Sequence, residues 1–261
     1  MRPLELVLFE IDPSRAKAAQ VQGISSFMFD VETRGKEERQ RTFDTDISVT
    51  SLDKLPTFVA KSAIHPICRL DPWHSGIASD IEQAITGGAS ELIFPMVRKA
   101  GEVEHLLSLV GGRIPSGIMI ETKEILDCIS DIGRMPLSRV YVGLNDIMIS
   151  RGRSNLFEPM VDGTVDRIRS QIGSLRFGIA GATRVDAGSP VPFRLLLADL
   201  ARLDVDFTFL RRSFRRDVKV DEIGPTVQDI AKLWLQLRAR PQFEVSRDRS
   251  AFTAAVLALA R

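Results

Sequence analysis

The amino-acid sequence predicts an α/β protein, a (β/α)8 TIM barrel with an extra C-terminal helix. Short apolar runs rich in Val, Ile and Phe alternate with longer segments of helical periodicity, which is typical of βα units around a parallel sheet. Eight such runs occur, the number of strands in this barrel. The length of 261 residues also suits the fold, so we expect one barrel domain spanning residues 1–261.

The eight predicted strands are short and mostly apolar. They span residues 4–9, 26–30, 67–70, 92–95, 117–120, 139–142, 177–180 and 207–210. In a barrel such strands run parallel, so their carboxyl ends meet on one face, where active sites of this fold lie.

Helix signals fill the intervals between the strands. Pro13, Ser51 and Ser75 stand where the first three helices should open, and glycines after the last turn should end the third to fifth. Further helices are predicted at residues 100–110, 123–132, 159–172, 192–203 and 223–240. The extra helix is predicted at residues 248–260, where apolar side chains share one face.

Residues 31–50, between the second strand and its helix, depart from this rhythm. The segment is long, strongly charged and nearly without apolar residues. Loops of this length in a compact domain are often functional, and a βα loop lies on the active-site face. Its basic residues, Arg34, Lys36, Arg39 and Arg41, suggest an anionic substrate, although a solvated charged loop would look the same.

Composition limits the possible partners. The net charge is +1, so we expect no nucleic-acid partner. No apolar run approaches the roughly 18 residues of a membrane span, and no signal peptide is visible. We therefore expect no membrane association and a cytoplasmic location.

Polar residues follow several predicted strands. Asp30 and Glu32 follow the second strand, Glu121 the fifth and Asp146 the sixth. Like charges gathered at a small opening repel, so the cluster needs a cation or altered protonation. Oxygen ligands without paired His or Cys suit Mg²⁺ or Mn²⁺. Because Glu121 and Asp146 end adjacent strands, they can share one ion, although each acid could instead cap a helix or pair with an arginine.

Two further side chains are candidates for chemistry. Arg69 emerges from an apolar run, where an anionic partner is needed, and its planar fork matches a carboxylate or phosphate. The alternative is an internal salt bridge to Asp30, Glu32 or Asp71. His74, just past the third strand, can reach the site or can be an ordinary loop histidine. No predicted strand carries a lysine, which weakens a Schiff-base mechanism.

Several motifs together resemble one known family. In order along the chain they are FMFDVE (27–32), CRLDPW (68–73), GGASELIFPMVRKAGEVEHL (87–106), GIMIETKEIL (117–126) and VYVGLNDIMISRG (140–152). They resemble the strand ends of the HpcH/HpaI aldolase and citrate lyase β-subunit family, within the phosphoenolpyruvate/pyruvate TIM-barrel superfamily. The charged segment and the later FGIAGATR and FLRRSF segments resemble a subgroup of that family.

This resemblance implies a metal-dependent carbon–carbon lyase, aldolase-like or citrate-lyase-like. Such an enzyme acts on a 2-oxo acid or acyl substrate through a metal-stabilised enolate. Glu121 and Asp146 would bind Mg²⁺ or Mn²⁺, and Arg69 would hold the substrate carboxylate and the enolate oxygen. The substrate contacts implied by the motifs are Pro95, Gly143 and Asn145. The family also implies a homo-oligomer that exchanges C-terminal helices.

The sequence departs from the family at the group that moves the proton. Thr33 stands where HpaI-type aldolases have a histidine and citrate-lyase-type members an aspartate. The catalytic candidates for proton transfer are therefore Asp30, Glu32 and His74, or a metal-bound water.

Two other functions fit the same sequence. A barrel isomerase or transferase acting on a phosphorylated sugar could bind phosphate through residues 178–184 and Arg211-Arg212, because late βα loops often do so. A non-catalytic barrel that binds a ligand is the other alternative. In each case the expected ligand is a small anion: a 2-oxo acid, an acyl compound or a phosphorylated compound.

Overall fold

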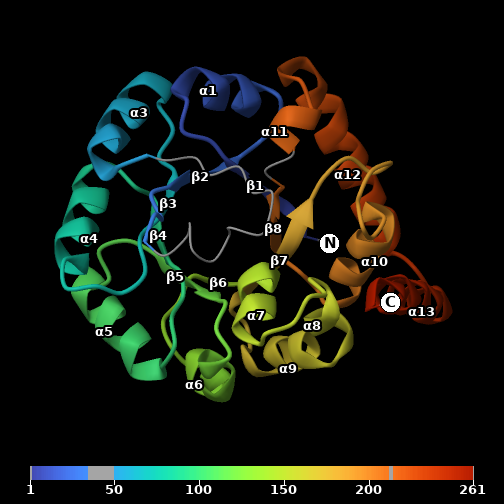
Figure 1. Cartoon of the computed structure of the whole chain (residues 1–261). Helices are drawn as coiled ribbons and strands as arrows, with labels where there is room; N and C mark the ends of the chain where they lie inside the picture. The colour runs from blue at the N-terminus through green and yellow to red at the C-terminus, as the bar shows by residue number, and fades with distance from the viewer. Residues whose placement is uncertain (1, 35–49, 212–213, 261) are drawn as a thin grey trace.

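The computed structural model describes residues 2–34, 50–211 and 214–260. Within them a closed parallel barrel is formed by eight strands in sequence order (Figure 1). The strands are β1 (Glu5–Phe9), β2 (Ser26–Asp30), β3 (Ile67–Arg69), β4 (Glu91–Phe94), β5 (Ser116–Ile120), β6 (Arg139–Val142), β7 (Arg176–Ala182) and β8 (Phe207–Leu210). The predicted barrel is confirmed, and every strand bound lies within two residues of its expected position.

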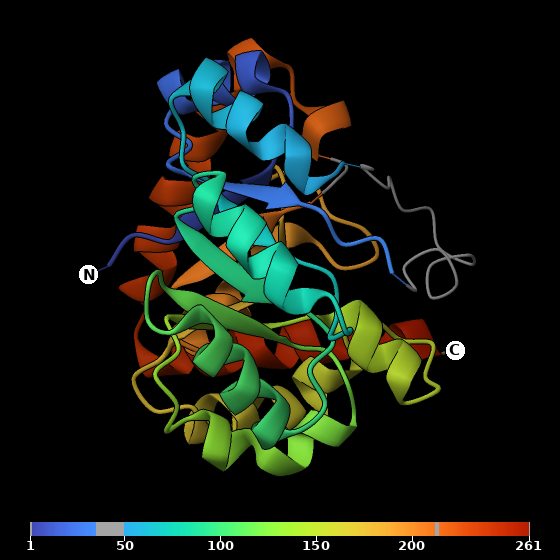
Figure 2. The same ribbon diagram turned by 90° about the vertical axis from the view of Figure 1, so that its left-hand side faces the viewer.

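Helices surround the barrel. They are α1 (Pro13–Val21), α3 (Leu55–Ser62), α4 (Ile77–Thr86), α5 (Ala100–Val110), α6 (Ile129–Ile132), α7 (Leu144–Ser150), α8 (Glu158–Val161), α9 (Thr164–Gln171), α10 (Phe193–Arg202), α11 (Phe214–Asp217), α12 (Ile223–Arg238) and α13 (Gln242–Leu257). Short 3₁₀ turns, Leu52–Lys54, Glu124–Cys128, Val220–Glu222 and Ala258–Ala260, adjoin α3, α6, α12 and α13. In Figure 2 the β2 arrow points toward the side seen face-on in Figure 1, so Figure 1 looks onto the carboxyl-terminal face.

The structure differs from the prediction at several helices. The helix expected at 159–172 divides into α8 and α9 at Gly163, whose φ of +89° interrupts the helix. The extra C-terminal helix begins at Gln242 rather than at residue 248, because Pro241 ends one helical segment and serves as the N-cap of the next. The short helices α7 and α11 were not predicted, and α7 has no side-chain cap bond.

The core has two parts. Inside the barrel, apolar side chains from alternate strand positions fill the middle: Val7, Met28, Ile67, Ile93, Met119, Tyr141, Phe207 and Phe209. A larger cluster lies between the strands and the surrounding helices and includes their opposite faces. The barrel is therefore a packed core rather than a pore.

Charged side chains close the amino-terminal end of the barrel. Glu5, Glu91, Arg139 and Arg176 each begin a strand, and they form one ion-pair network. Arg139 Nη2 lies 2.7 Å from Glu91 Oε2, and its guanidinium lies 4.7 Å from the centre of the Phe207 ring. Burial favours a higher pKa for Glu5, but Arg139, Ser26 and Arg176 outweigh it and lower the pKa. These four groups neutralise one another.

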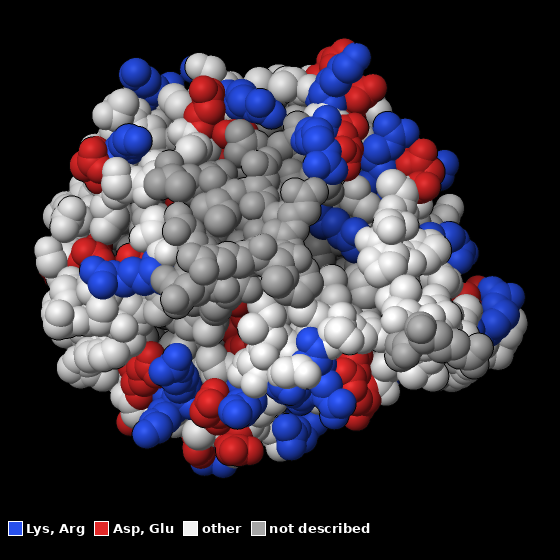
Figure 3. All heavy atoms as spheres, viewed as in Figure 1, with Lys and Arg blue, Asp and Glu red and all other residues white. Residues whose placement is uncertain are grey.

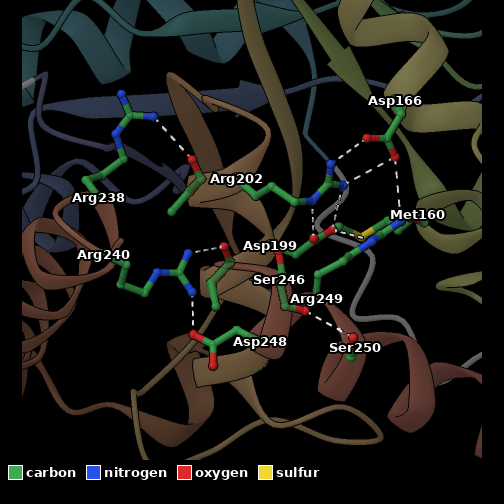
Figure 4. A network of polar contacts seen from close by, with 12 residues as sticks. Met160, Asp166, Asp199, Arg202, Arg238, Arg240, Ser246, Asp248, Arg249 and Ser250 are labelled. Carbon is green, nitrogen blue, oxygen red and sulfur yellow. Dashed lines mark hydrogen bonds and ion pairs between the residues drawn. The ribbon is translucent and has the colours of Figure 1, made fainter. Parts of the chain in front are cut away.

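The last helix is attached to its own barrel by ion pairs (Figure 4). Asp199 of α10 is fully buried and accepts hydrogen bonds from Arg202 Nε at 2.6 Å and from Arg249 Nη1 of α13 at 2.9 Å. Arg240 pairs with Asp248 within the same region. Because α13 packs on α10, the appendage lies on its own barrel; the expected homo-oligomer stays a prediction.

The surface has no single dominant sign of charge on the face seen in Figure 3. Basic and acidic side chains are interspersed around its periphery, which agrees with the small net charge. None of the described helices is both long enough and apolar enough to cross a membrane.

The buried position of Asp199 makes the α10–α13 contact testable. Asp199→Asn removes the charge between two arginines, so we expect the free energy of unfolding to fall by about 2–4 kcal/mol. The matched control is Asp204→Asn, because Asp204 also pairs with two arginines but its side chain is 63% exposed. There we expect a loss of about 0–1 kcal/mol. Urea denaturation measures both, and equal losses would contradict this account.

Candidate functional site

A cavity of about 420 Å³ opens at the carboxyl-terminal face. Residues from strand ends around much of the ring line it: Phe9, Arg69, Met119, Glu121, Tyr141, Gly143, Leu144, Asn145, Asp146, Leu156, Phe157, Ala180, Gly181, Phe209, Leu210 and Arg211. This lining combines a mostly apolar wall with a few charged groups, as in sites for small ligands.

Glu121 directly follows β5 and is only 3% exposed. The Met96 backbone N–H donates to its Oε2 at 3.1 Å. Met96 has a φ of +56°, a conformation that is costly for a residue with a side chain, and this conformation accompanies the contact. A Cβ atom on Gly143 would lie 2.5 Å from both Cγ and Oε1 of Glu121, so only glycine leaves room for the carboxylate. The position of the Glu121 carboxylate is thus fixed by the loop that contains Met96 and by the loop that contains Gly143.

Asp146 brings a second carboxylate to the same cavity. It lies in the first turn of α7, which begins directly after β6 and Gly143, and β6 pairs with β5. Burial raises the pKa of Glu121 well above its ordinary value, and the charges of Asp146 and Glu32 raise it further. Negative charge is therefore disfavoured at Glu121, and a nearby cation would relieve this.

Arg69 lies at the end of β3 in a fixed geometry. Its Nε and Nη2 donate to the two carboxylate oxygens of Asp30 at 2.9 and 2.7 Å, and its Nη1 lies 3.2 Å from Glu32 Oε2. Burial acts against its charge, but Asp30 and Glu32 outweigh it and raise the pKa of Arg69. Arg69 makes the internal salt bridge that was one of its two interpretations; it also lines the cavity, and its contact with a substrate anion stays a prediction. Asp71 is not its partner; it pairs with Arg34.

The donor set suits a hard divalent ion. Among the described residues, no group of three or more His, Cys, Asp or Glu side chains is arranged to bind a metal. Mg²⁺, however, commonly uses one or two protein carboxylates and completes its shell with water and substrate oxygens. Glu121 and Asp146, with the charge at Glu121 disfavoured, meet that requirement.

The other predicted site residues divide into two groups. Gly143 and Asn145 line the cavity, whereas Pro95 and His74 are not among the described lining residues. Pro95 is buried and precedes Met96, so it shapes the loop whose N–H contacts Glu121. His74 Nε2 lies 2.9 Å from Asp80, and its Nδ1 accepts from the Gly76 N–H. The predicted charged loop lies mostly at 35–49, outside the described residues.

An aromatic wall was not predicted. Tyr141 stacks on Phe209 with ring centroids 3.8 Å apart, and its hydroxyl donates to the Ala180 carbonyl. Ala180 has a φ of +63°, where β7 and β8 change register. One signal was available: Tyr141 is the only tyrosine and alternates with two valines that face the helices, so it must point into the barrel.

Comparison with known proteins supports the fold. No family model matches the sequence, and no curated protein matches it. Among solved structures, the citrate synthase SbnG is 18% identical, with a TM-score of 0.58 over 80% of this chain and 86% of that one. A citrate lyase β subunit from M. tuberculosis, complexed with oxaloacetate and magnesium, is 17% identical, with a TM-score of 0.56 over 89% and 97%.

A HpcH/HpaI aldolase/citrate lyase family protein from Burkholderia cenocepacia J2315 is 13% identical, with a TM-score of 0.58 over 80% of this chain and 88% of that one. These structures share the barrel fold with this chain. Two of them carry the family names that the sequence motifs resemble.

The raised pKa of Glu121 predicts how the stability of the metal-free protein depends on pH. The folded protein keeps the Glu121 proton where the unfolded chain, with a value near 4.5, has lost it. The free energy of unfolding therefore falls as pH rises through this interval. Glu121→Gln removes the titration, so its stability relative to wild type should increase as the pH rises above about 5. Urea denaturation in EDTA measures this.

The control for that experiment is Glu124→Gln, because Glu124 is exposed three positions away. Its stability relative to wild type should not change with pH. A Glu121→Gln variant that becomes relatively less stable toward high pH would show that the Glu121 charge is not disfavoured.

Gly143 provides a steric test of the same geometry. Its φ of −84° is open to alanine, and the three atoms nearest to an added Cβ all belong to Glu121, so the cost of Gly143→Ala comes mainly from that clash. We expect a loss of about 1–3 kcal/mol in the free energy of unfolding. Gly101→Ala is the control: nothing lies within 4 Å of a Cβ there, and α5 should gain about 0.5–1 kcal/mol. Equal effects would mean that Glu121 does not lie against Gly143.

Proposed function

We propose that this protein is a divalent-metal-dependent carbon–carbon lyase, aldolase-like or citrate-lyase-like, acting on a 2-oxo acid or acyl substrate through an enolate. Its site would lie in one barrel domain spanning residues 1–261. The observation that carries the proposal is the buried Glu121 carboxylate, disfavoured as an anion and placed beside Asp146 in the cavity that Arg69 lines. The magnesium and oxaloacetate in the similar citrate lyase β subunit support it.

Glu121 and Asp146 would hold Mg²⁺ or Mn²⁺. An ion there would supply Lewis-acid polarisation of a substrate carbonyl oxygen, the chemistry needed to stabilise an enolate. The carboxylates themselves fix where that oxygen can lie, because Glu121 is held by Met96 and Gly143.

Arg69 would add fixed positive charge next to the developing negative charge. Asp30 holds two of its nitrogens and Glu32 a third, so the guanidinium is oriented before substrate binds. Such preorganised charge is most effective in a site that excludes water. The apolar wall around Tyr141 and Phe209 would provide that exclusion, and Asn145 would orient the substrate.

The predicted candidates for proton transfer differ in the contacts that the fold gives them. Asp30 and Glu32 both contact Arg69, which makes them positioning groups as well as possible bases. His74 is engaged by Asp80 and is the candidate that the geometry favours least. A water bound in the cavity would be the remaining candidate.

The phosphorylated-sugar alternative is less well supported. Arg184, which ends the segment proposed to bind phosphate, pairs with Asp186 and lines a different surface pocket. The non-catalytic alternative makes the same metal prediction as the lyase and differs only in turnover.

Metal binding and proton exchange test the proposal together. We expect Mg²⁺ or Mn²⁺ to bind by calorimetry and to promote deuterium exchange into the methyl group of pyruvate, followed by NMR. Glu121→Gln and Asp146→Asn should each weaken metal binding more than about 100-fold, since even outer contacts to metal ligands are worth about 10–100-fold. Deuterium exchange into pyruvate should be lost together with metal binding.

The control variants are Glu124→Gln and Asp127→Asn, which remove exposed carboxylates close by in the sequence. Both should bind metal and exchange like wild type. Metal binding that persists in Glu121→Gln would overturn the proposed site. Normal metal binding without exchange for pyruvate or other 2-oxo acids would favour the non-catalytic barrel.

A further inference from the structure

Arg211 is a second arginine of the cavity, and the proposed chemistry does not use it. It directly follows β8, and its backbone N–H donates to the Ala182 carbonyl at 2.9 Å. Its side chain donates from Nε to the Gly181 carbonyl at 3.1 Å and from Nη1 to the Ser189 carbonyl at 3.2 Å. The guanidinium is thus oriented by backbone groups and contributes to the cavity lining.

The charge of Arg211 lacks a carboxylate partner among the described residues. Its side-chain contacts there are two backbone carbonyls, which are neutral, whereas Arg69 meets two carboxylates. Burial disfavours the cation and lowers the pKa of Arg211. A guanidinium has five N–H donors, so donors remain available for a planar anion.

The backbone of β7 makes room for this side chain. A Cβ atom on Gly181 would lie 2.8 Å from Arg211 Cγ, so the arginine stem lies directly against that glycine. The register shift between Gly178 and Gly181 lies at the same place. Arg211 is therefore held in position rather than extended into solvent.

The position of Arg211 in the ring separates it from the groups that would hold the reacting end of a substrate. In the closed barrel, β8 is three strands from β3, which carries Arg69, and three from β5, which precedes Glu121. A ligand that contacts Arg211 and the Glu121–Asp146 pair together must therefore span part of the cavity.

We propose that Arg211 is a specificity-determining residue that binds a second carboxylate of the substrate, remote from the reacting carbonyl. The substrate class is then a 2-oxo acid with a further carboxylate, a dianion rather than a pyruvate-like monoanion. This inference rests on the proposed function for the reacting end and adds the recognition of the other end. A carboxylate fits better than a phosphate, because its single negative charge matches the one positive charge of Arg211, whereas a phosphate carries more than one.

Matched pairs of 2-oxo acids test the inference. 2-Oxoglutarate and 2-oxopentanoate have the same carbon chain and differ in one terminal carboxylate, as do oxaloacetate and 2-oxobutanoate. We expect wild type with Mg²⁺ to bind at least one diacid about 10- to 100-fold more tightly than its partner, measured by calorimetry at low salt. Arg211→Gln should abolish this preference and leave monoacid binding within about threefold.

Two further variants make the result specific. Arg211→Lys should keep part of the preference, because it keeps the charge and loses the fork. Arg194→Gln, which removes an exposed arginine of α10, should keep all of it. Unchanged monoacid binding in Arg211→Gln shows that the fold and the metal site are intact.

The outcomes separate this inference from the proposed function. A diacid preference that survives in Arg211→Gln, or no preference in wild type, overturns the role of Arg211; pyruvate exchange would still support the lyase. A preference that needs Arg211, in a protein that binds no metal and shows no exchange, keeps the role and contradicts the lyase. Binding of inorganic phosphate that depends on Arg211, without any diacid preference, would overturn the carboxylate assignment.

Discussion

The buried charge of Glu121 is the constraint around which the site is arranged. Burial and two neighbouring carboxylates act against the anion, and the charge of Arg69 and one hydrogen bond from Met96 compensate only in part. That bond comes from a backbone in the left-handed region, which costs about 1–3 kcal/mol for a residue with a side chain. The absence of a side chain at Gly143 leaves space for the same carboxylate. This arrangement costs stability, which is the pattern expected if Glu121 has the proposed metal-binding role.

The barrel separates its interior charges into two layers with an apolar middle. At the amino-terminal end, two glutamates and two arginines pair with one another and are fully compensated. The carboxyl-terminal layer differs, because acids outnumber arginines among its described members, Asp30, Glu32, Glu121, Asp146, Arg69 and Arg211. A compensated network holds strands together. A network with excess negative charge attracts a cation. We therefore expect ion binding and chemistry at the carboxyl-terminal end of the barrel and not at the amino-terminal end.

Much of this could be predicted from the sequence. Apolar runs and turn signals predicted the position of every strand. The parallel topology of those strands also predicted that Glu121 and Asp146 lie at one cavity. The conformations of Met96 and Ala180 could not be predicted, because neither residue type favours a positive φ; the fold imposes it. The predicted start of α13 was wrong because apolar periodicity is weak before Phe252. The hydrogen bond between Asp199 and Arg249 is a tertiary contact, and sequence periodicity gives no information on such contacts.

Arg69 and Arg211 show that residue type alone does not fix a role in this cavity. Arg69 meets two carboxylates before any substrate arrives, so the local unit of Arg69, Asp30 and Glu32 carries no net positive charge. The guanidinium can orient a substrate oxygen and stabilise charge that develops beside it, but the unit as a whole cannot neutralise a bound carboxylate. The positive charge that the proposed 2-oxo acid substrate would need must therefore come from elsewhere in the cavity. The Glu121–Asp146 pair would bring it as a cation for the reacting end, and Arg211, oriented by neutral carbonyls, offers it for the other.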